Sequence, residues 1–157
     1  MKYIRILFSV ITLSYTVNAF AADNNVYGSI NADRSDYGIN YEKNIDDKLN
    51  IGVGLAYSPT NAIFKNKVFS LPLTANWLWG KNIHKLETGF GATIKTSRIP
   101  LDPSESYKTQ IVTVNPTVSL GYRYMPTAKG VSIRAAITPS YLQKITTALS
   151  FGLGYTF

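Results

Sequence analysis

Apolar and polar residues alternate along most of the chain with the two-residue period of a β-strand. The clearest stretch is 49–58, where large apolar residues at the odd positions alternate with Asn, Gly, Ala and Ser. Polar and Gly-containing segments separate such stretches, as in antiparallel strands joined by turns and loops. The alternation predicts eight strands: 26–33, 37–42, 49–58, 69–79, 85–95, 112–124, 131–141 and 150–157.

The composition of the two strand faces predicts which face lies inside. One face is apolar and aromatic, whereas the other is mainly Gly, Ala, Ser, Thr and Asn with few charges. Solvent-facing surfaces of soluble sheets are usually richer in Lys and Glu. Small residues fit the interior of an eight-stranded barrel, which barely accommodates side chains. The pattern therefore predicts an all-β, eight-stranded antiparallel up-and-down transmembrane barrel with its apolar face toward lipid. A soluble lipocalin-like barrel, with the faces reversed, is the alternative.

The last predicted strand carries a recognisable pattern at its end. Ser150 and Gly152 are followed by large aromatic residues at the third-last and last positions, Tyr155 and Phe157. This pattern resembles the C-terminal insertion signal of bacterial outer-membrane β-barrels. The resemblance implies a location in the outer membrane of a Gram-negative bacterium, and handling by the barrel-assembly machinery during insertion.

The amino end has the organisation of a secretory signal peptide, which we expect to comprise residues 1–21. Two positive charges precede an apolar run at 6–17, and Ala19 and Ala21 have the spacing that a signal peptidase needs. The run is shorter than the roughly 20 residues of a spanning helix, although a retained anchor is the alternative. Residues 22–157 are then expected to form one barrel domain.

Composition and charge narrow the classes of partner. The chain has no cysteine, which excludes disulfides, thiolate metal sites and cysteine nucleophiles. The formal net charge is +7, but export and the lack of a clustered basic helix argue against a nucleic-acid partner. Anionic lipid head groups are the partner that this charge favours. One histidine and scattered carboxylates offer no metal-ligand spacing, so we expect no metal and no cofactor.

Connection lengths predict the orientation of the barrel. With both termini in the periplasm, the long connections 59–67 and 97–107 face the exterior, and the shorter turns face inward. Tyr and Trp residues near the strand ends would form the two interfacial belts. Loop 97–107 is the candidate for binding an extracellular ligand, because rigid scaffolds carry binding functions on their loops.

Parts of four strands resemble a widespread and poorly characterised group of small bacterial outer-membrane barrels: 71–73, 87–91, 121–126 and 134–139. The resemblance covers about half of the mature chain and implies a fold and a location without a defined activity. In size, the predicted barrel is similar to the OmpA/OmpX type. Pro72, Pro116 and Pro139 fall inside predicted strands, where proline removes a ladder donor, so we expect bulges or bends there.

Charged residues with inward parity form the first candidate site: Glu42, Lys85, Glu87, Arg123 and Arg134. Unpaired charges in so narrow a lumen are costly, so these residues should pair. We expect Glu87 to pair with Arg123 and Arg134, because their strands are neighbours. The cluster is interpreted either as a polar plug that fills the lumen and fixes strand register, or as an ion-conducting constriction.

Basic residues predicted at the outer rim form the second candidate site: Arg34, Lys65, Lys67, Arg98, Lys108 and Lys144. Cations at this position could contact the phosphates of lipopolysaccharide. Ordinary solvated loop charge is the alternative.

Enzyme chemistry is the remaining alternative, since some small outer-membrane barrels hydrolyse or transfer acyl chains of lipid A with a Ser-His-acid set. The one histidine, His84, lies in or beside a predicted periplasmic turn, on the wrong side for outer-leaflet lipid A, and no His-x-Ser pattern is present. The sequence therefore predicts a non-enzymatic structural or surface-interaction protein with a filled lumen and no catalytic residues. A narrow pore and a lipid A acyl hydrolase or transferase remain the alternatives.

Overall fold

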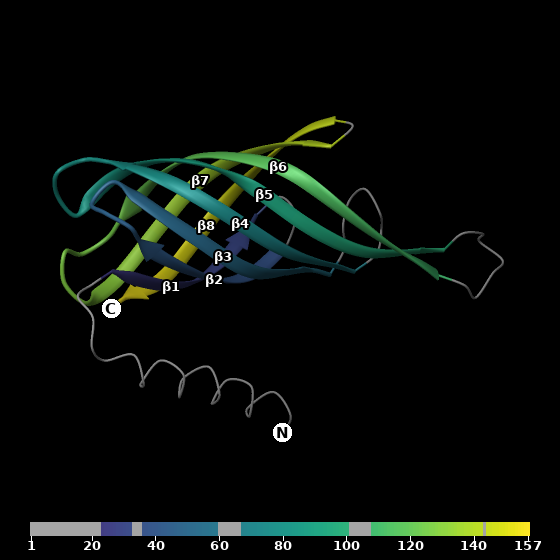
Figure 1. The fold of residues 1–157 in the computed structure, drawn as a ribbon, viewed down its shortest axis with the longest axis horizontal. Coiled ribbons are helices and arrows are strands. Elements are labelled where there is room, and N and C mark those ends of the chain that lie inside the picture. Colours follow the sequence, from purple (N-terminus) through teal and green to yellow (C-terminus); the bar gives the residue numbers. More distant parts are fainter. Residues whose placement is uncertain (1–22, 33–35, 60–66, 101–107, 143) are drawn as a thin grey trace, which may run out of the picture.

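The computed structural model describes residues 23–32, 36–59, 67–100, 108–142 and 144–157. The predicted signal peptide lies outside these ranges. Within them, no helix is long and apolar enough to span a membrane. Eight strands form one closed antiparallel barrel in which each strand pairs with its neighbours in the chain and β1 pairs with β8 (Figure 1). The strands are β1 (Asn24–Asn31), β2 (Asp36–Asn44), β3 (Leu49–Ser58), β4 (Val68–Trp79), β5 (His84–Pro100), β6 (Lys108–Tyr124), β7 (Gly130–Leu142) and β8 (Lys144–Thr156). The predicted up-and-down barrel is confirmed.

The apolar face of each strand points outward. Along β3, the exposed fractions of Ile51, Val53 and Leu55 are 48%, 43% and 69%, whereas Asn50 is fully buried. The same alternation runs along the other strands, so the outer wall is apolar and aromatic. The lumen holds the small and polar residues, as predicted. Such a wall suits acyl chains, because a large exposed apolar surface is unfavourable in water.

The two ends of the barrel differ in their connections. The inner end, defined here as the one with Asn24 and Phe157, carries the short turns 45–48, 80–83 and 125–129. In the second of these turns Gly80 has φ 137°, a conformation that L side chains rarely adopt. At the outer end β5 and β6 extend beyond the rest of the wall (Figure 1). The outer connections 59–67 and 101–107 are longer than any inner turn, whereas 32–35 and residue 143 are not. The pattern of short periplasmic turns and longer exterior connections therefore holds for two of the four outer connections.

Three strand boundaries at the outer end were missed by several residues. Residues 97–100 belong to β5 and not to the loop 97–107. In addition, β6 begins at Lys108 and not at residue 112, and β8 begins at Lys144 and not at residue 150. The hairpin ladders continue there, with pairs such as Pro100↔Lys108 and Leu142↔Lys144. The alternation in the sequence is weaker there, with threonine at both 146 and 147, so the predicted strand ends before the ladder does.

Pro72 interrupts the ladder between β3 and β4 without changing its register. The pairs Val53↔Leu73 and Ala56↔Ser70 keep one register, and among the described residues no pair lies between them. Proline cannot donate to a ladder, so the strands lose pairing at this point. Of the two expected distortions, the unchanged register excludes a bulge here, because a bulge would have shifted it, and leaves the bend as a prediction.

Pro139 has the same effect between β6 and β7. Pairing stops above Leu120↔Ile137, and in the described part of both strands it resumes only at Thr117↔Ser140, in the same register. The unchanged register again excludes a bulge. Pro116 leaves the pairing of β6 with β5 unbroken. The outer half of the wall is therefore less completely paired than the inner half.

Candidate functional site

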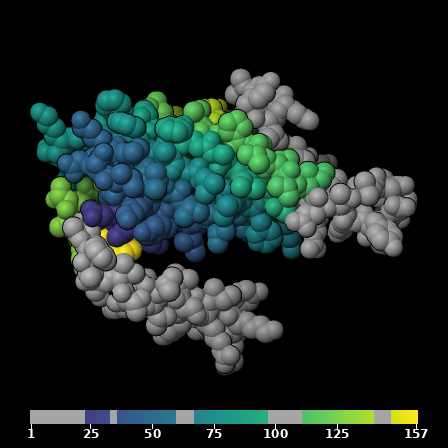
Figure 2. All heavy atoms as spheres, in the orientation of Figure 1, coloured from purple at the N-terminus to yellow at the C-terminus, as the bar shows by residue number. Residues whose placement is uncertain are grey.

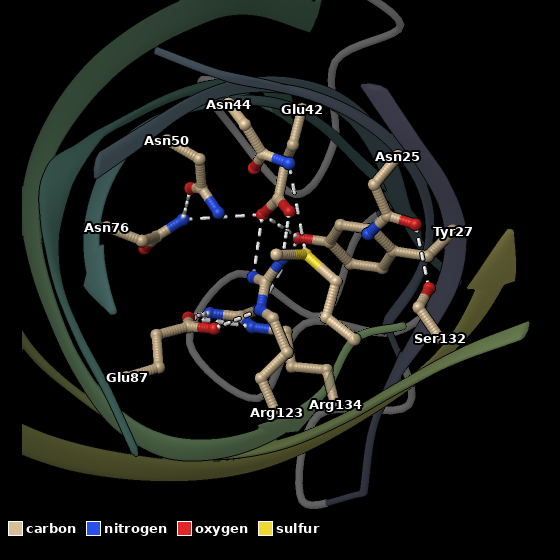
Figure 3. A network of polar contacts seen from close by, with 11 residues as sticks. Asn25, Tyr27, Glu42, Asn44, Asn50, Asn76, Glu87, Arg123, Ser132 and Arg134 are labelled. Atoms are coloured by element: carbon tan, nitrogen blue, oxygen red, sulfur yellow. Dashed lines mark hydrogen bonds and ion pairs between the residues drawn. The ribbon is translucent and has the colours of Figure 1, made fainter. Parts of the chain in front are cut away.

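Arg123 lies in the inner half of the lumen between two buried carboxylates (Figure 3). Its Nε donates to Glu87 Oε2 at 2.6 Å, and its Nη1 and Nη2 donate to Glu42, the latter at 3.0 Å from Oε1. Glu87 belongs to the neighbouring strand β5, whereas Glu42 belongs to β2 on the far side of the barrel. Arg123 therefore connects opposite walls of the lumen.

Arg134 brings the second positive charge to this site from β7. Its Nε and Nη2 donate to Glu87 Oε1 at 2.8 and 2.5 Å. The two oxygens of Glu87 thus accept from different guanidinium groups. Two carboxylates and two guanidiniums balance in charge, which is the condition under which buried ions are tolerated.

Tyr27, from β1, completes the cluster. Its hydroxyl donates to Glu42 Oε1 at 3.1 Å, and the guanidinium carbons of Arg123 and Arg134 lie 5.9 and 5.8 Å from its ring centroid. Such distances allow cation–π attraction. We call the set Tyr27, Glu42, Glu87, Arg123 and Arg134 the buried ion network.

Asparagines and glycines support the network. Asn76 Nδ2 donates to Glu42 Oε1 at 3.3 Å and to Asn50 Oδ1 at 2.9 Å. A Cβ at Gly52 would lie 2.9 Å from Glu42 Cγ, and one at Gly152 would lie 2.9 Å from the Tyr27 ring. The small residues of the lumen therefore make room for the large ones. Together the network and the two asparagines draw on every strand from β1 to β7, and they fill a cross-section of the lumen (Figure 3).

The structure brings together four of the five residues of the predicted charge cluster but not Lys85. Lys85 Nζ donates to the backbone carbonyl of Asp47 at 2.9 Å, in the turn between β2 and β3. A long lysine side chain near a barrel mouth can extend its charge toward water, and this one does so. Sequence reasoning also missed the roles of Tyr27, Asn50 and Asn76. Their inward parity was the available signal, because Tyr27 shares a face with serine and asparagine.

A polar cavity of about 140 Å³ lies between the network and the outer end of the barrel. Tyr27 and Arg134 lie at its inner end, and Ser, Thr and Asn side chains form most of its wall. Asn115 is 3% exposed, and its Nδ2 has no hydrogen-bond partner among the described residues. The lumen is thus filled by side chains in its inner half and hollow further out.

The outer-rim residues are placed only in part. Arg34 and Lys65 lie outside the described residues. Lys67 is exposed and directly precedes β4. The remaining three were predicted in loops, but they lie at the outer ends of strands because the hairpin ladders extend further than predicted: Arg98, Lys108 and Lys144.

The residues of the insertion-signal pattern lie on β8, at the closure of the barrel. Ser150 and Gly152 face the lumen, and Tyr155 is 50% exposed on the outer wall. Phe157 exchanges backbone hydrogen bonds with Asn24 at 2.8 and 3.1 Å, which ties the last residue to the first strand.

His84 lies at the inner end, as the sequence predicted. Its Nδ1 is 2.5 Å from the Tyr122 hydroxyl, and its ring also contacts Tyr124. These contacts place it among the aromatic residues of the inner belt. In the described ranges, no group of three His, Cys, Asp or Glu residues could hold a metal ion.

No family model matches the sequence, and no curated protein matches it in sequence. Solved structures do share its fold. The N-terminal β-barrel domain of Pseudomonas aeruginosa OprF aligns with a TM-score of 0.64 at 13% identity, over 88% of this chain and 100% of that domain. Neisserial surface protein A (NspA) aligns with a TM-score of 0.60 at 16% identity, over 85% and 93% of the two chains. Ail of Yersinia pestis aligns with a TM-score of 0.52 at 12% identity, over 85% and 91%.

At these identities the likeness concerns the fold. The shared fold agrees with the features of the chain itself, which are a closed barrel, an apolar outer wall and a polar lumen. A closed barrel satisfies all backbone groups between its strands, and it can therefore face lipid. The chain is a small eight-stranded transmembrane β-barrel of the bacterial outer-membrane type.

Proposed function

We propose that this protein is a non-enzymatic outer-membrane barrel whose lumen is closed by the buried ion network, and which acts through its exterior rim. The observation that carries the proposal is that Arg123 pairs with Glu87 on the neighbouring strand and with Glu42 across the lumen. These side chains are at most 1% exposed, so they leave little room for water beside them. The network acts as a plug and as a brace between opposite walls.

A closed lumen is expected because opening the network would separate buried charges. Removing one partner of a buried ion pair typically costs about 3–5 kcal/mol. A similar cost opposes movement of the Arg123 guanidinium away from its carboxylates, which would open the lumen. Planar-bilayer recording of the refolded protein should therefore show no resolvable steady current. A reproducible single-channel conductance in the wild type would contradict the plug.

A narrow pore is the second candidate, and the polar cavity beside the network favours it. In that case the network would be a gate, and conductance should rise when the network is weakened in a protein that still folds. Glu42→Gln is a suitable variant, since it keeps the side-chain shape and removes one charge. Current in this variant but not in the wild type would favour a gate.

An enzymatic role is tested separately. We expect the mass spectrum of lipid A to be the same with and without expression of the protein. A change in acyl-chain number or length would contradict the non-enzymatic proposal.

The rim residues support a lipid-facing role for the exterior end. We propose that the six predicted rim residues contact phosphates of lipopolysaccharide, because cations there face the most highly charged layer of the membrane. Lys67 is the best placed for a first test, since it is exposed just before β4. The candidate extracellular-ligand loop is best tested by deleting 101–107 alone, because 97–100 form part of β5. Recovery of the same partners by the deleted and intact proteins in a pull-down would contradict that role.

A further inference from the structure

A groove of about 500 Å³ lies on the outer wall across β2 to β5, toward the outer end. These strands form much of the face turned to the viewer in Figure 2. The lining is mostly apolar and aromatic, and its main residues are Ile39, Leu55, Tyr57, Phe69, Leu71 and Ile94. The rest of the outer wall also faces lipid, but here it is hollowed.

The groove coincides with a break in the strand ladder. It lies over the point where Pro72 interrupts the pairing of β3 with β4. Phe69 is 64% exposed and lies on a wall of the groove. Leu71 and Ile94 are less exposed and lie at its floor. The rings of Tyr57 and Phe69 lie 5.1 Å apart at the outer end of the groove.

The position of the groove identifies the membrane leaflet. Along β4, Phe69 and Trp79 lie at opposite ends of the apolar band, which spans about 25 Å of membrane at the usual strand rise and tilt. Trp79 is at the inner end, so the groove meets the acyl chains of the outer leaflet. The main lipid of that leaflet is lipid A, which carries phosphates. Lys67 stands beyond Phe69 on the head-group side.

We propose that this groove is a binding site for one acyl chain of lipid A, with a lipid A phosphate within reach of Lys67. An acyl chain suits the lining because it needs no hydrogen-bond partner, whereas a peptide in the same place would leave its backbone groups unsatisfied. The proposal rests on the placement of the barrel in the outer membrane. It does not depend on whether the lumen is closed.

The test is to fill the groove. Leu71→Trp adds bulk at its floor, and Leu120→Trp makes the same change on the outer wall of β6, away from the groove. Purified full-length mature protein in detergent is titrated with lipid A, and native mass spectrometry counts the complexes. Leu71→Trp should weaken binding about tenfold, the effect of unburying roughly two methylene groups. The control should bind as the wild type does. Equal binding by both variants would overturn the proposal.

Two further arms keep the test decisive. A gel-shift assay of heat-modifiability shows whether each variant folds. If Leu71→Trp does not fold, Thr96→Phe replaces it in the test, because it fills the same groove from β5. Lys67→Gln should weaken binding of lipid A but not of lipid A from which the phosphates have been removed. If phosphatidylethanolamine binds the wild type as tightly as lipid A does, the assignment to lipid A is wrong. A conducting wild type would refute the plug and leave all these outcomes unchanged.

Discussion

The inner and outer halves of the lumen hold the barrel together in different ways. In the inner half, the ion pair of Arg123 with Glu42 links opposite walls, and Glu87 is fully buried beside it. In the outer half, a polar cavity occupies the lumen, and strand pairing is interrupted near Pro72 and Pro139. Side-chain ion pairs in the lumen stabilise the inner half, whereas the outer half depends mainly on hydrogen bonds between its strands. Substitutions that remove charge should therefore have large effects in the former and small ones in the latter.

The difference also has a functional side. A fixed inner half favours one register of the strands from β1 to β7, because each inward residue of the network must meet its partner. The outer half then has freedom to vary in strand length and in surface shape. The groove on β2 to β5 and the long β5–β6 hairpin both occur there (Figure 1). Rigid scaffolds that carry variable ends are a common arrangement for recognition.

The largest expected effect is that of removing the central guanidinium. Arg123→Met should destabilise the barrel by about 3–5 kcal/mol, because Glu42 would stay buried without its ion pair. Urea-induced unfolding in lipid vesicles measures the change. Lys67→Met is the outer-end control, since this lysine is exposed just before β4, and it should cost at most about 1 kcal/mol. Equal losses in the two variants would remove the distinction between the halves.

The next effect concerns the carboxylate that accepts from both arginines. Glu87→Gln keeps the size of the side chain but removes its charge, and it should cost about 2–4 kcal/mol. Heat-modifiability on gels and urea unfolding both report the loss. Asp36→Asn, at the outer end of β2, is the matched change and should have little effect. A Glu87→Gln protein with an unaltered gel shift and unfolding midpoint would show that the pairing does not stabilise the barrel.

Packing around Tyr27 gives a smaller effect without changing any charge. At Gly152 an added Cβ would lie 2.9 Å from the Tyr27 ring, so Gly152→Ala should cost about 1–3 kcal/mol through overpacking. At Gly28 the nearest atom would be 3.9 Å away, an ordinary contact, so Gly28→Ala should be tolerated. Thermal unfolding of the two variants compares them directly. A tolerated Gly152→Ala would mean that the Tyr27 ring can move aside.

The inner half was also the more predictable from sequence, for a physical reason. Within the membrane each strand separates lipid from lumen, so alternation predicts both the strands and their faces. Neighbouring strands in an up-and-down barrel are consecutive in the chain, which is why Glu87 could be assigned to Arg123 and Arg134. The contact of Glu42 with Arg123 spans the lumen, and no local pattern encodes such a distance. The strand limits were missed at residues 97–100, 108–111 and 144–149, although Ala148 and Leu149 continue the alternation of β8.

The smallest expected effect lies outside the lumen, in the turn between β2 and β3. Asp46 Oδ1 accepts hydrogen bonds from the backbone N–H groups of Lys48 and Leu49, both at 2.7 Å, which holds the pKa of this carboxyl below its usual range. A lowered pKa in the folded state means that the charged form stabilises the fold at neutral pH. This contribution is lost as the pH falls through the folded-state pKa.

Asp46→Ala should therefore lower the unfolding midpoint slightly at pH 7, and the difference from wild type should vanish in strong acid. Asp47→Ala, one residue on in the same exposed turn, is the control. If the inner end owes its stability to the network, even the loss of the Asp46 turn contacts should leave heat-modifiability unchanged. A loss of barrel closure in Asp46→Ala would instead mean that this turn, and not the ion pairs of the lumen, holds the inner end together.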